Sequence, residues 1–307
     1  MTTGDPTRGP IPLRPMNLGD LLDGAVRLFV ANWRALLLAI GVVVVPLQLV
    51  SAFLQRDQLR FDFFQLLTDP AALERLAQQG AVGSPAEQAA SLINGLVWVL
   101  VLPVLAGAAC VIAGRSYLGE PADWRAALGT AAGRFGSLVG AAILVHISEV
   151  LAILPAFVAL GAAVAAGSGG LAALSLLLLL GGIIGVAIVT ALFVATAPAI
   201  VTEGLGPVAA MRRSWQLRKP RLGPTVVAVI VAGILVGIIA FLVGTVPVLI
   251  GTRLGGPLAW VLAGLGGMLG QLVQIPFAAI VATLLYFDGR VRQEGLDLQV
   301  RAADLDR

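Results

Sequence analysis

The chain has 307 residues, of which 58% are hydrophobic and only 12% are charged, and its mean hydropathy is +0.96. Soluble domains carry about 25% charged residues, so this chain has too few polar side chains to cover its apolar surface in water. The composition excludes a soluble globular protein and predicts that the bilayer surrounds most of the chain.

The N-terminal segment, residues 1–17, has no apolar h-region and contains acidic as well as basic residues. It is therefore not a cleavable signal peptide. We expect it to be disordered and cytoplasmic, so that the first hydrophobic span directs insertion into the membrane.

Six hydrophobic segments are long enough to cross the bilayer, which takes about 20 mostly apolar residues. Glycine-rich breakers separate the third segment from the fourth and the fifth from the sixth. We predict an all-α membrane domain over residues 18–290 and a cytoplasmic tail over 291–307. The spans are expected at about 35–55, 90–113, 138–165, 171–200, 224–250 and 258–286.

Basic residues are distributed unequally over the two sides that these six spans define. Sixteen Lys and Arg residues fall on the side of the termini and four on the other side. The positive-inside rule then places both termini in the cytoplasm of a multi-pass plasma-membrane protein. A reporter fused near Ala81, in the outward loop 56–88, is expected to be active outside the membrane. We also expect one helix of this loop to lie on the outer surface.

A short amphipathic segment precedes each odd-numbered span. Apolar residues recur with helical spacing, opposite charged residues, in residues 18–29, 124–135 and 207–219. Pro207 suits the first position of the third of these helices. Even-numbered spans instead carry Pro103, Pro198 and Pro276, which are expected to bend them. The predicted architecture is three hairpins with amphipathic elbows lying in the headgroup plane.

The basic residues next to these elbows predict contacts with anionic lipid headgroups rather than with nucleic acid. The candidates are Arg34, Arg134, Arg212, Arg213, Arg218, Lys219, Arg221, Arg290 and Arg292. Trp33, Trp124 and Trp215 are interpreted as interfacial anchors.

Small residues four positions apart predict close helix contacts. The chain has 37 glycines, and the pairs are Gly136/Gly140, Gly181/Gly185, Gly233/Gly237 and Gly266/Gly270. Packing within one chain is favoured over dimerisation.

Glu149 is the only charged residue between Phe135 and Thr202, and the only histidine, His146, lies one helical turn before it. Both would lie about 15–20 Å into the third span. The pair predicts a proton relay or ion site, or else a protonated Glu149 bonded to His146, Ser148 or an amide. Alternatively, the third span begins later and the pair lies near headgroups. The candidate amides are Asn94, Gln271 and Gln274.

Signatures of catalysis are missing from the sequence. One buried carboxylate is too few for a di-iron bundle site, and no zinc-protease, Walker A or nucleophile-elbow motif occurs. The single cysteine, Cys110, lies in an apolar run and is interpreted as a small buried hydrophobe. We expect no enzyme activity, no metal and no cofactor.

Three segments carry a resemblance to a known family: RPMNLGDLLDGAVRLF (14–29) with the following NWRALL, TEGLGPVAAMRRSW (202–215) and TLLYFDGRVRQEGLDL (283–298). They resemble an actinobacterial group of six-span proteins that is similar to the membrane domain of some glycerophosphoryl diester phosphodiesterases. The resemblance implies a membrane-embedded module of uncharacterised role. It does not imply phosphodiesterase activity, because the catalytic barrel would need about 200 further residues.

The sequence favours a non-catalytic membrane module that organises lipids, or membrane or cytoplasmic partner proteins, through its cytoplasmic elbows and tail. The alternative is a small transporter or channel that uses the Glu149/His146 pair, supported by the prolines in the spans and the approximate repeats. A dry, glycine-packed core would favour the module, and a hydrated cavity reaching Glu149 would favour transport.

Overall fold

The structure is a computed structural model and describes residues 14–54, 85–254, 259–296, 298 and 299. This part of the chain contains helices and short connections, without a β-strand. The long helices are α1 (Leu18–Leu54), α4 (Pro85–Tyr117), α6 (Phe135–Ala166), α7 (Gly169–Phe193), α10 (Leu222–Leu254) and α11 (Ala259–Glu294). Between them lie α5 (Trp124–Gly133), α8 (Thr196–Glu203), α9 (Pro207–Arg218) and the 3-10 turn η1 (Lys219–Arg221).

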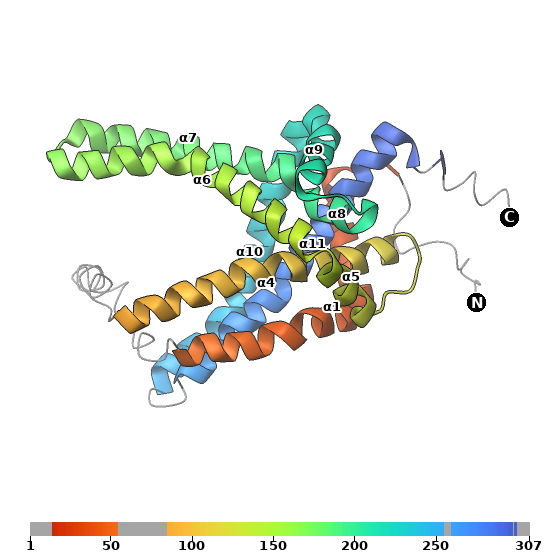
Figure 1. The fold of residues 1–307 in the computed structure, drawn as a ribbon, viewed down its shortest axis with the longest axis horizontal. Helices are drawn as coiled ribbons and strands as arrows, with labels where there is room; N and C mark the ends of the chain where they lie inside the picture. The colour runs from red at the N-terminus through yellow and green to blue at the C-terminus, as the bar shows by residue number, and fades with distance from the viewer. Residues whose placement is uncertain (1–13, 55–84, 255–258, 297, 300–307) are drawn as a thin grey trace.

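Six helical segments are long and apolar enough to cross a membrane. The prediction of an all-α chain with six such helices is confirmed (Figure 1). The outward loop predicted over 56–88, with its surface helix, lies outside the described residues except at its end, where α4 begins at Pro85.

The first predicted elbow is continuous with its span, whereas the other two are the separate helices α5 and α9. Asn17 caps α1, because its side chain accepts a hydrogen bond from the amide of Asp20 at 2.8 Å. Neither glycine nor proline occurs between Ala25 and Ile40, so nothing ends the helix before the span. The 37 residues of α1 extend about 55 Å, more than the hydrocarbon thickness of about 30 Å.

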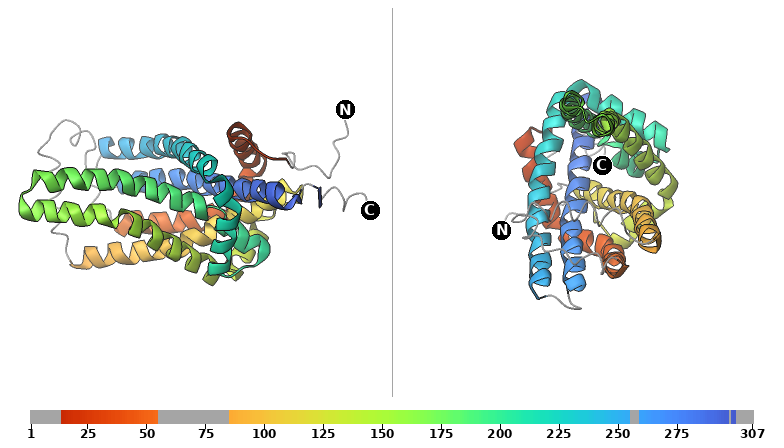
Figure 2. Two further views of the ribbon diagram at one scale, coloured as in Figure 1. Left: turned by 90° about the horizontal axis from the view of Figure 1, so that it is seen from above. Right: turned by 90° about the vertical axis from the view of Figure 1, so that its left-hand side faces the viewer.

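The most buried span is α11, which contacts α1, α4, α8, α9 and α10. Half of the most apolar 18-residue stretch of α11 is buried, compared with 6% of the corresponding stretch of α6. Helices α6 and α7 pack chiefly against each other, and the outer part of this hairpin stands apart from the other spans (Figure 1, Figure 2). So much exposed apolar surface is stable when lipid is the solvent, which agrees with a multi-pass membrane protein.

Two of the predicted glycine pairs contribute at least one glycine to a contact between neighbouring spans. Gly270 of α11 is close to α10, since an added Cβ would lie 3.3 Å from the carbonyl oxygen of Ala240. Gly185 of α7 faces α6, where an added Cβ would lie 3.2 Å from Ala152. By contrast, Gly233 and Gly237 of α10 have no neighbouring atom within 4 Å of an added Cβ. The predicted packing within the chain thus applies to some pairs and not to all.

A break in the fourth span separates α7 from α8, just before Pro198. Proline lacks an amide hydrogen and its ring collides with the preceding turn, so the helical hydrogen bonds are interrupted there. Ser214 of α9 compensates for the break: its Oγ donates to the carbonyl of Leu192 at 2.6 Å and accepts from the amide of Ala195 at 3.1 Å. This side chain is completely buried and joins α9 to the fourth span.

We expect Ser214→Ala to destabilise the protein, because it leaves a carbonyl and an amide without partners in the interior. Each such group costs about 1–3 kcal/mol. The free energy of unfolding can be measured by titrating mixed micelles with SDS and following tryptophan fluorescence. The matched control is Ser175→Ala: this serine is also buried but donates only to its own helix, at the Ala172 carbonyl. Equal effects of the two substitutions would contradict the bridging role of Ser214.

Candidate functional site

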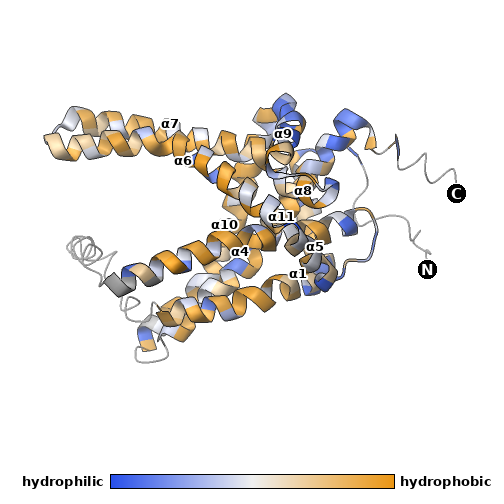
Figure 3. Ribbon diagram, in the orientation of Figure 1, coloured by the Kyte–Doolittle hydropathy of each residue, from blue (hydrophilic) through white to orange (hydrophobic). Residues whose placement is uncertain are grey.

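Polar side chains gather at one end of the helical bundle, named here the arginine-rich end. It comprises α5, α8, α9 and η1, together with the beginning of α1 and the C-terminal end of α11 (Figure 1, Figure 3). Both ends of the described chain lie there (Figure 1). Segments from the beginning, the middle and the end of the sequence therefore meet in one region.

The carboxylate of Asp288 on α11 is the centre of a first cluster at this end. Its Oδ1 accepts hydrogen bonds from the amide of Met16 at 2.9 Å and from Nε of Arg292 at 2.7 Å. Arg292 also donates to the carbonyl of Met16 at 2.8 Å, and Nη1 of Arg218 lies 4.0 Å from Oδ2 of Asp288. These four residues are named the Asp288 cluster. It holds both backbone groups of Met16 and so fixes the segment before α1 against the sixth span.

Arg218, the last residue of α9, is only 1% exposed. Gly289 makes room for its guanidinium, since an added Cβ there would collide with Nη2 of Arg218. Burial lowers the pKa of Arg218 to about 10 and the Asp288 carboxylate opposes this shift, so the side chain stays charged at neutral pH. The structure thus corrects the prediction that Arg218 contacts headgroups: it is an interior cation that requires a counter-ion.

A second cluster, named the Glu203 network, joins α8, α9 and α11. Arg213 forms ion pairs with Glu203 at 2.9 Å and with Glu294 at 2.5 Å. The hydroxyl of Tyr286 donates to Glu203 at 2.6 Å, and Arg290 donates to Glu294 at 3.0 Å. The hydrogen bond to Glu294 raises the pKa of Arg213. The network fastens the α8–α9 turn to the end of α11.

These two clusters unite the three segments on which the family resemblance rests. Residues 14–29 contribute Met16, residues 202–215 contribute Glu203 and Arg213, and residues 283–298 contribute Tyr286, Asp288, Arg290, Arg292 and Glu294. These arginines were assigned to headgroup contacts from the sequence, and their association with the acidic residues was missed. The available signal was the presence of acidic residues in the same short segments.

The nine predicted headgroup cations divide into two groups. Arg213, Arg218, Arg290 and Arg292 belong to the two clusters, and Arg134 donates to the carbonyl of Gly204 at 2.9 Å. The remaining four are exposed and form no ion pair with the part of the chain that the structure describes: Arg34, Arg212, Lys219 and Arg221.

Each of the three predicted interfacial tryptophans carries a cation over its ring. Arg34 lies 5.2 Å from the ring centroid of Trp33, Arg125 lies 4.9 Å from that of Trp124, and Lys219 lies 5.8 Å from that of Trp215. An aromatic ring with an adjacent cation suits the headgroup level of a bilayer, where one part of a side chain meets hydrocarbon and the other meets water and phosphate.

Glu149 lies between α6 and α7. Its Oε1 accepts a hydrogen bond from the hydroxyl of Thr190 at 2.9 Å, and its Oε2 lies 2.9 Å from Nδ1 of His146. The side chain of Glu149 is 21% exposed, whereas that of His146 is 62% exposed. The pair is therefore at the surface of the α6–α7 hairpin and not in the core around α11. Thr190 was not predicted, because sequence contains no signal for the register of two packed helices.

The three candidate amides lie in another part of the bundle. Asn94 of α4 accepts a hydrogen bond from Ser51 of α1, and Gln271 of α11 donates one to Gln48 of α1 at 3.3 Å. Gln274 is exposed on α11. Within the described ranges none of them is hydrogen-bonded to the acid on α6, so the predicted polar set does not form a single site.

Groups of His, Cys, Asp and Glu that could hold a metal ion are not found among the described residues. Cys110 of α4 is buried against α11, with its Sγ 3.7 Å from the carbonyl oxygen of Ala279. Comparisons with family models, curated proteins and solved structures gave no match to the chain. The family resemblance therefore stays a prediction from the three segments named above.

Proposed function

We propose that the chain is a non-catalytic integral membrane module that organises anionic lipids at the cytoplasmic face of the plasma membrane. The arginine-rich end would be the cytoplasmic end, in accordance with the positive-inside rule. Partner proteins, in the membrane or in the cytoplasm, are the other form of this prediction and would use the same surface.

The exposed cations at the arginine-rich end carry this proposal. The Asp288 cluster and the Glu203 network pair four arginines with three internal carboxylates. Arg34, Arg212, Lys219 and Arg221 keep their charge for an external anion, and two of them lie over tryptophan rings. Each basic residue near an anionic membrane contributes about 1 kcal/mol of attraction.

The proposal predicts an enrichment of anionic lipid around the protein. The full chain can be extracted with its surrounding lipids into copolymer nanodiscs, and the lipids can be compared with those of the bulk membrane by mass spectrometry. We expect several-fold enrichment of phosphatidylglycerol. The enrichment should disappear when the four exposed cations are replaced by glutamine.

A matched control replaces the four basic residues assigned to the opposite side: Arg56, Arg60, Arg75 and Arg253. This variant removes the same number of charges and should keep the enrichment. Bulk lipid composition around the unmodified protein, or equal losses in both variants, would contradict the proposed function.

The transporter alternative has weaker support from the same geometry. Glu149 has its partners within the α6–α7 hairpin, and the candidate amides do not extend a polar path from it. Thr190 and His146 satisfy the carboxylate locally, which agrees with a structural role.

A further inference from the structure

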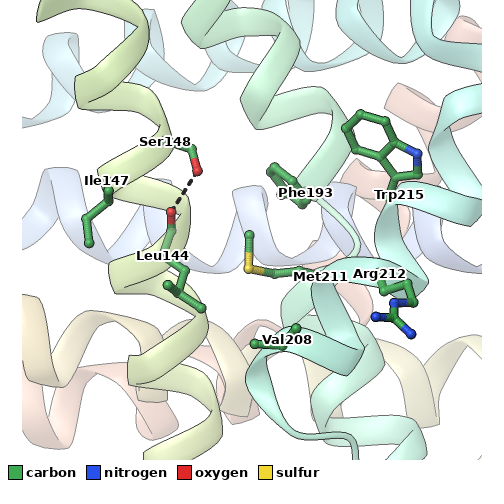
Figure 4. A pocket seen from close by; sticks show the side chains of 8 residues that line it. All are labelled: Leu144, Ile147, Ser148, Phe193, Val208, Met211, Arg212 and Trp215. Atoms are coloured by element: carbon green, nitrogen blue, oxygen red, sulfur yellow. Dashed lines mark hydrogen bonds between the residues drawn. The ribbon is translucent and has the colours of Figure 1, made fainter.

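A groove of about 420 Å³ opens between α6 and α9, next to the C-terminal end of α7 (Figure 4). Its lining is Leu144, Ile147 and Ser148 of α6, Phe193 of α7, and Val208, Met211, Arg212 and Trp215 of α9. Figure 4 shows Met211 extending from α9 towards α6, with the guanidinium of Arg212 at the edge of the group. The volume is within the range of about 300–1,000 Å³ that is typical of small-molecule sites.

The apolar side of this groove is an exposed stripe of α9. The buried face of this helix is formed by Ala210, Ser214, Leu217 and Arg218. The apolar residues Val208 and Trp215 lie outside this face: Val208 is 61% exposed and Trp215 is 41% exposed. An amphipathic helix that keeps apolar side chains outside the protein core presents them to hydrocarbon.

The polar groups of the groove are few and select the charge of its occupant. The hydroxyl of Ser148 donates to the carbonyl of Leu144 in its own helix at 2.9 Å. Arg212 has no ion-pair partner in the part of the chain that the structure describes, and Lys219 lies over the adjacent Trp215 ring. The groove therefore combines a long apolar surface with a cationic edge.

Resting on the proposed function, we propose that this groove binds one anionic phospholipid, with an acyl chain between α6 and α9 and the phosphate on Arg212. A soluble anion would gain nothing from the apolar lining. A zwitterionic lipid would bring the cation of its headgroup towards Arg212 and Lys219, and these like charges would repel each other. A phospholipid with net negative charge satisfies both parts of the site.

The position of the groove along α6 agrees with the headgroup level. From Glu149 to the end of α6 at Ala166 the helix extends about 27 Å, at 1.5 Å per residue. This length is close to the hydrocarbon thickness of about 30 Å. The α6 side of the groove, formed by residues just before Glu149, would then lie where phosphates are found.

Tryptophan quenching by brominated lipids tests the site directly, because Trp215 lines it. A protein retaining Trp215 alone is made by phenylalanine substitution of Trp33, Trp98, Trp124 and Trp260, with its fold checked by circular dichroism. It is reconstituted in phosphatidylcholine vesicles that contain brominated phosphatidylglycerol or brominated phosphatidylcholine at low mole fraction. We expect association at Trp215 to favour phosphatidylglycerol about fivefold, and to show no preference in a protein retaining Trp260 alone.

Two variants of the Trp215 protein separate the charge from the groove. Arg212→Gln should abolish the preference and leave quenching by phosphatidylcholine unchanged. Val208→Phe should fill the groove and reduce quenching by both lipids. Arg27→Gln, at an exposed cation of α1 outside the groove, should preserve the preference.

A photoreactive benzoylphenylalanine at Met211, with all tryptophans retained, gives a second measurement if the phenylalanine variant does not fold. Cross-linked phosphatidylglycerol should be found by mass spectrometry and be lost with Arg212→Gln. Three results would each contradict the proposed lipid site in the groove: no preference at Trp215, a preference that survives Arg212→Gln, or no lipid adduct. If phosphatidylglycerol is still enriched around the whole protein in that case, the proposed function stands without the groove site. If the enrichment is also absent, the proposed function is rejected as well.

Discussion

Replacing Asp288 by asparagine is expected to lower the free energy of unfolding by about 3–5 kcal/mol. The substitution preserves the size of the side chain but removes the negative charge. Arg218, which is 1% exposed, would then remain in the interior without its counter-ion. Met16 and Arg292 would also lose a charged acceptor. SDS titration in mixed micelles, followed by tryptophan fluorescence, measures the loss.

Two further variants show whether the buried charge is the cause. Asp23→Asn removes a carboxylate whose ion pair with Arg27 has side chains that are 62% and 63% exposed. It should cost less than about 1 kcal/mol. Combining Asp288→Asn with Arg218→Met removes both charges and should recover part of the loss. A double variant as unstable as Asp288→Asn alone would contradict this explanation.

Gly266→Ala is expected to separate α10 from α11 and to destabilise the protein by about 1–3 kcal/mol. An added Cβ would collide with the carbonyl oxygen of Gly244 and would lie 2.8 Å from Cγ2 of Val248. A backbone oxygen cannot rotate away as the end of a long side chain can, so the two helices must move. The same SDS titration measures this effect.

The control is Gly233→Ala on the outer face of α10. No atom lies within 4 Å of the added Cβ at this position. Alanine should therefore raise stability by up to about 1 kcal/mol, through its higher helix propensity. Destabilisation at Gly233 as large as at Gly266 would show that helix contacts do not explain the loss.

The six spans could be predicted because a charge-free run of about 20 residues has few alternatives to a membrane helix. The separate helices α5 and α9 could also be located, and Pro207 does open α9. The continuity of α1 was less evident, since a change from amphipathic to uniformly apolar composition does not by itself end a helix. Only a breaker or a cap does so.

The pairs Asp288–Arg292 and Arg290–Glu294 have the i,i+4 spacing of helical ion pairs, but their connection to distant segments could not be predicted, for a physical reason. A hydropathy scale assigns each arginine the free-energy cost of burying an isolated charge. The actual cost depends on the partner that the tertiary structure brings to the arginine. Met16 and Asp288 lie at opposite ends of the sequence, and no local spacing relates them. Burial of Arg218 likewise depends on the orientation of α9, which turns Ala210 and Ser214 inwards.

The central position of α11 has a consequence for biosynthesis. This helix is the last of the six spans to leave the ribosome, yet it contacts α1, α4 and α10 and carries the acid that binds Met16. The earlier helices must therefore remain in the bilayer without their contacts to α11 until translation of α11 is complete. Assembly of the core should consequently be a late, post-insertion event, and the docking of the N-terminal segment can occur only after it.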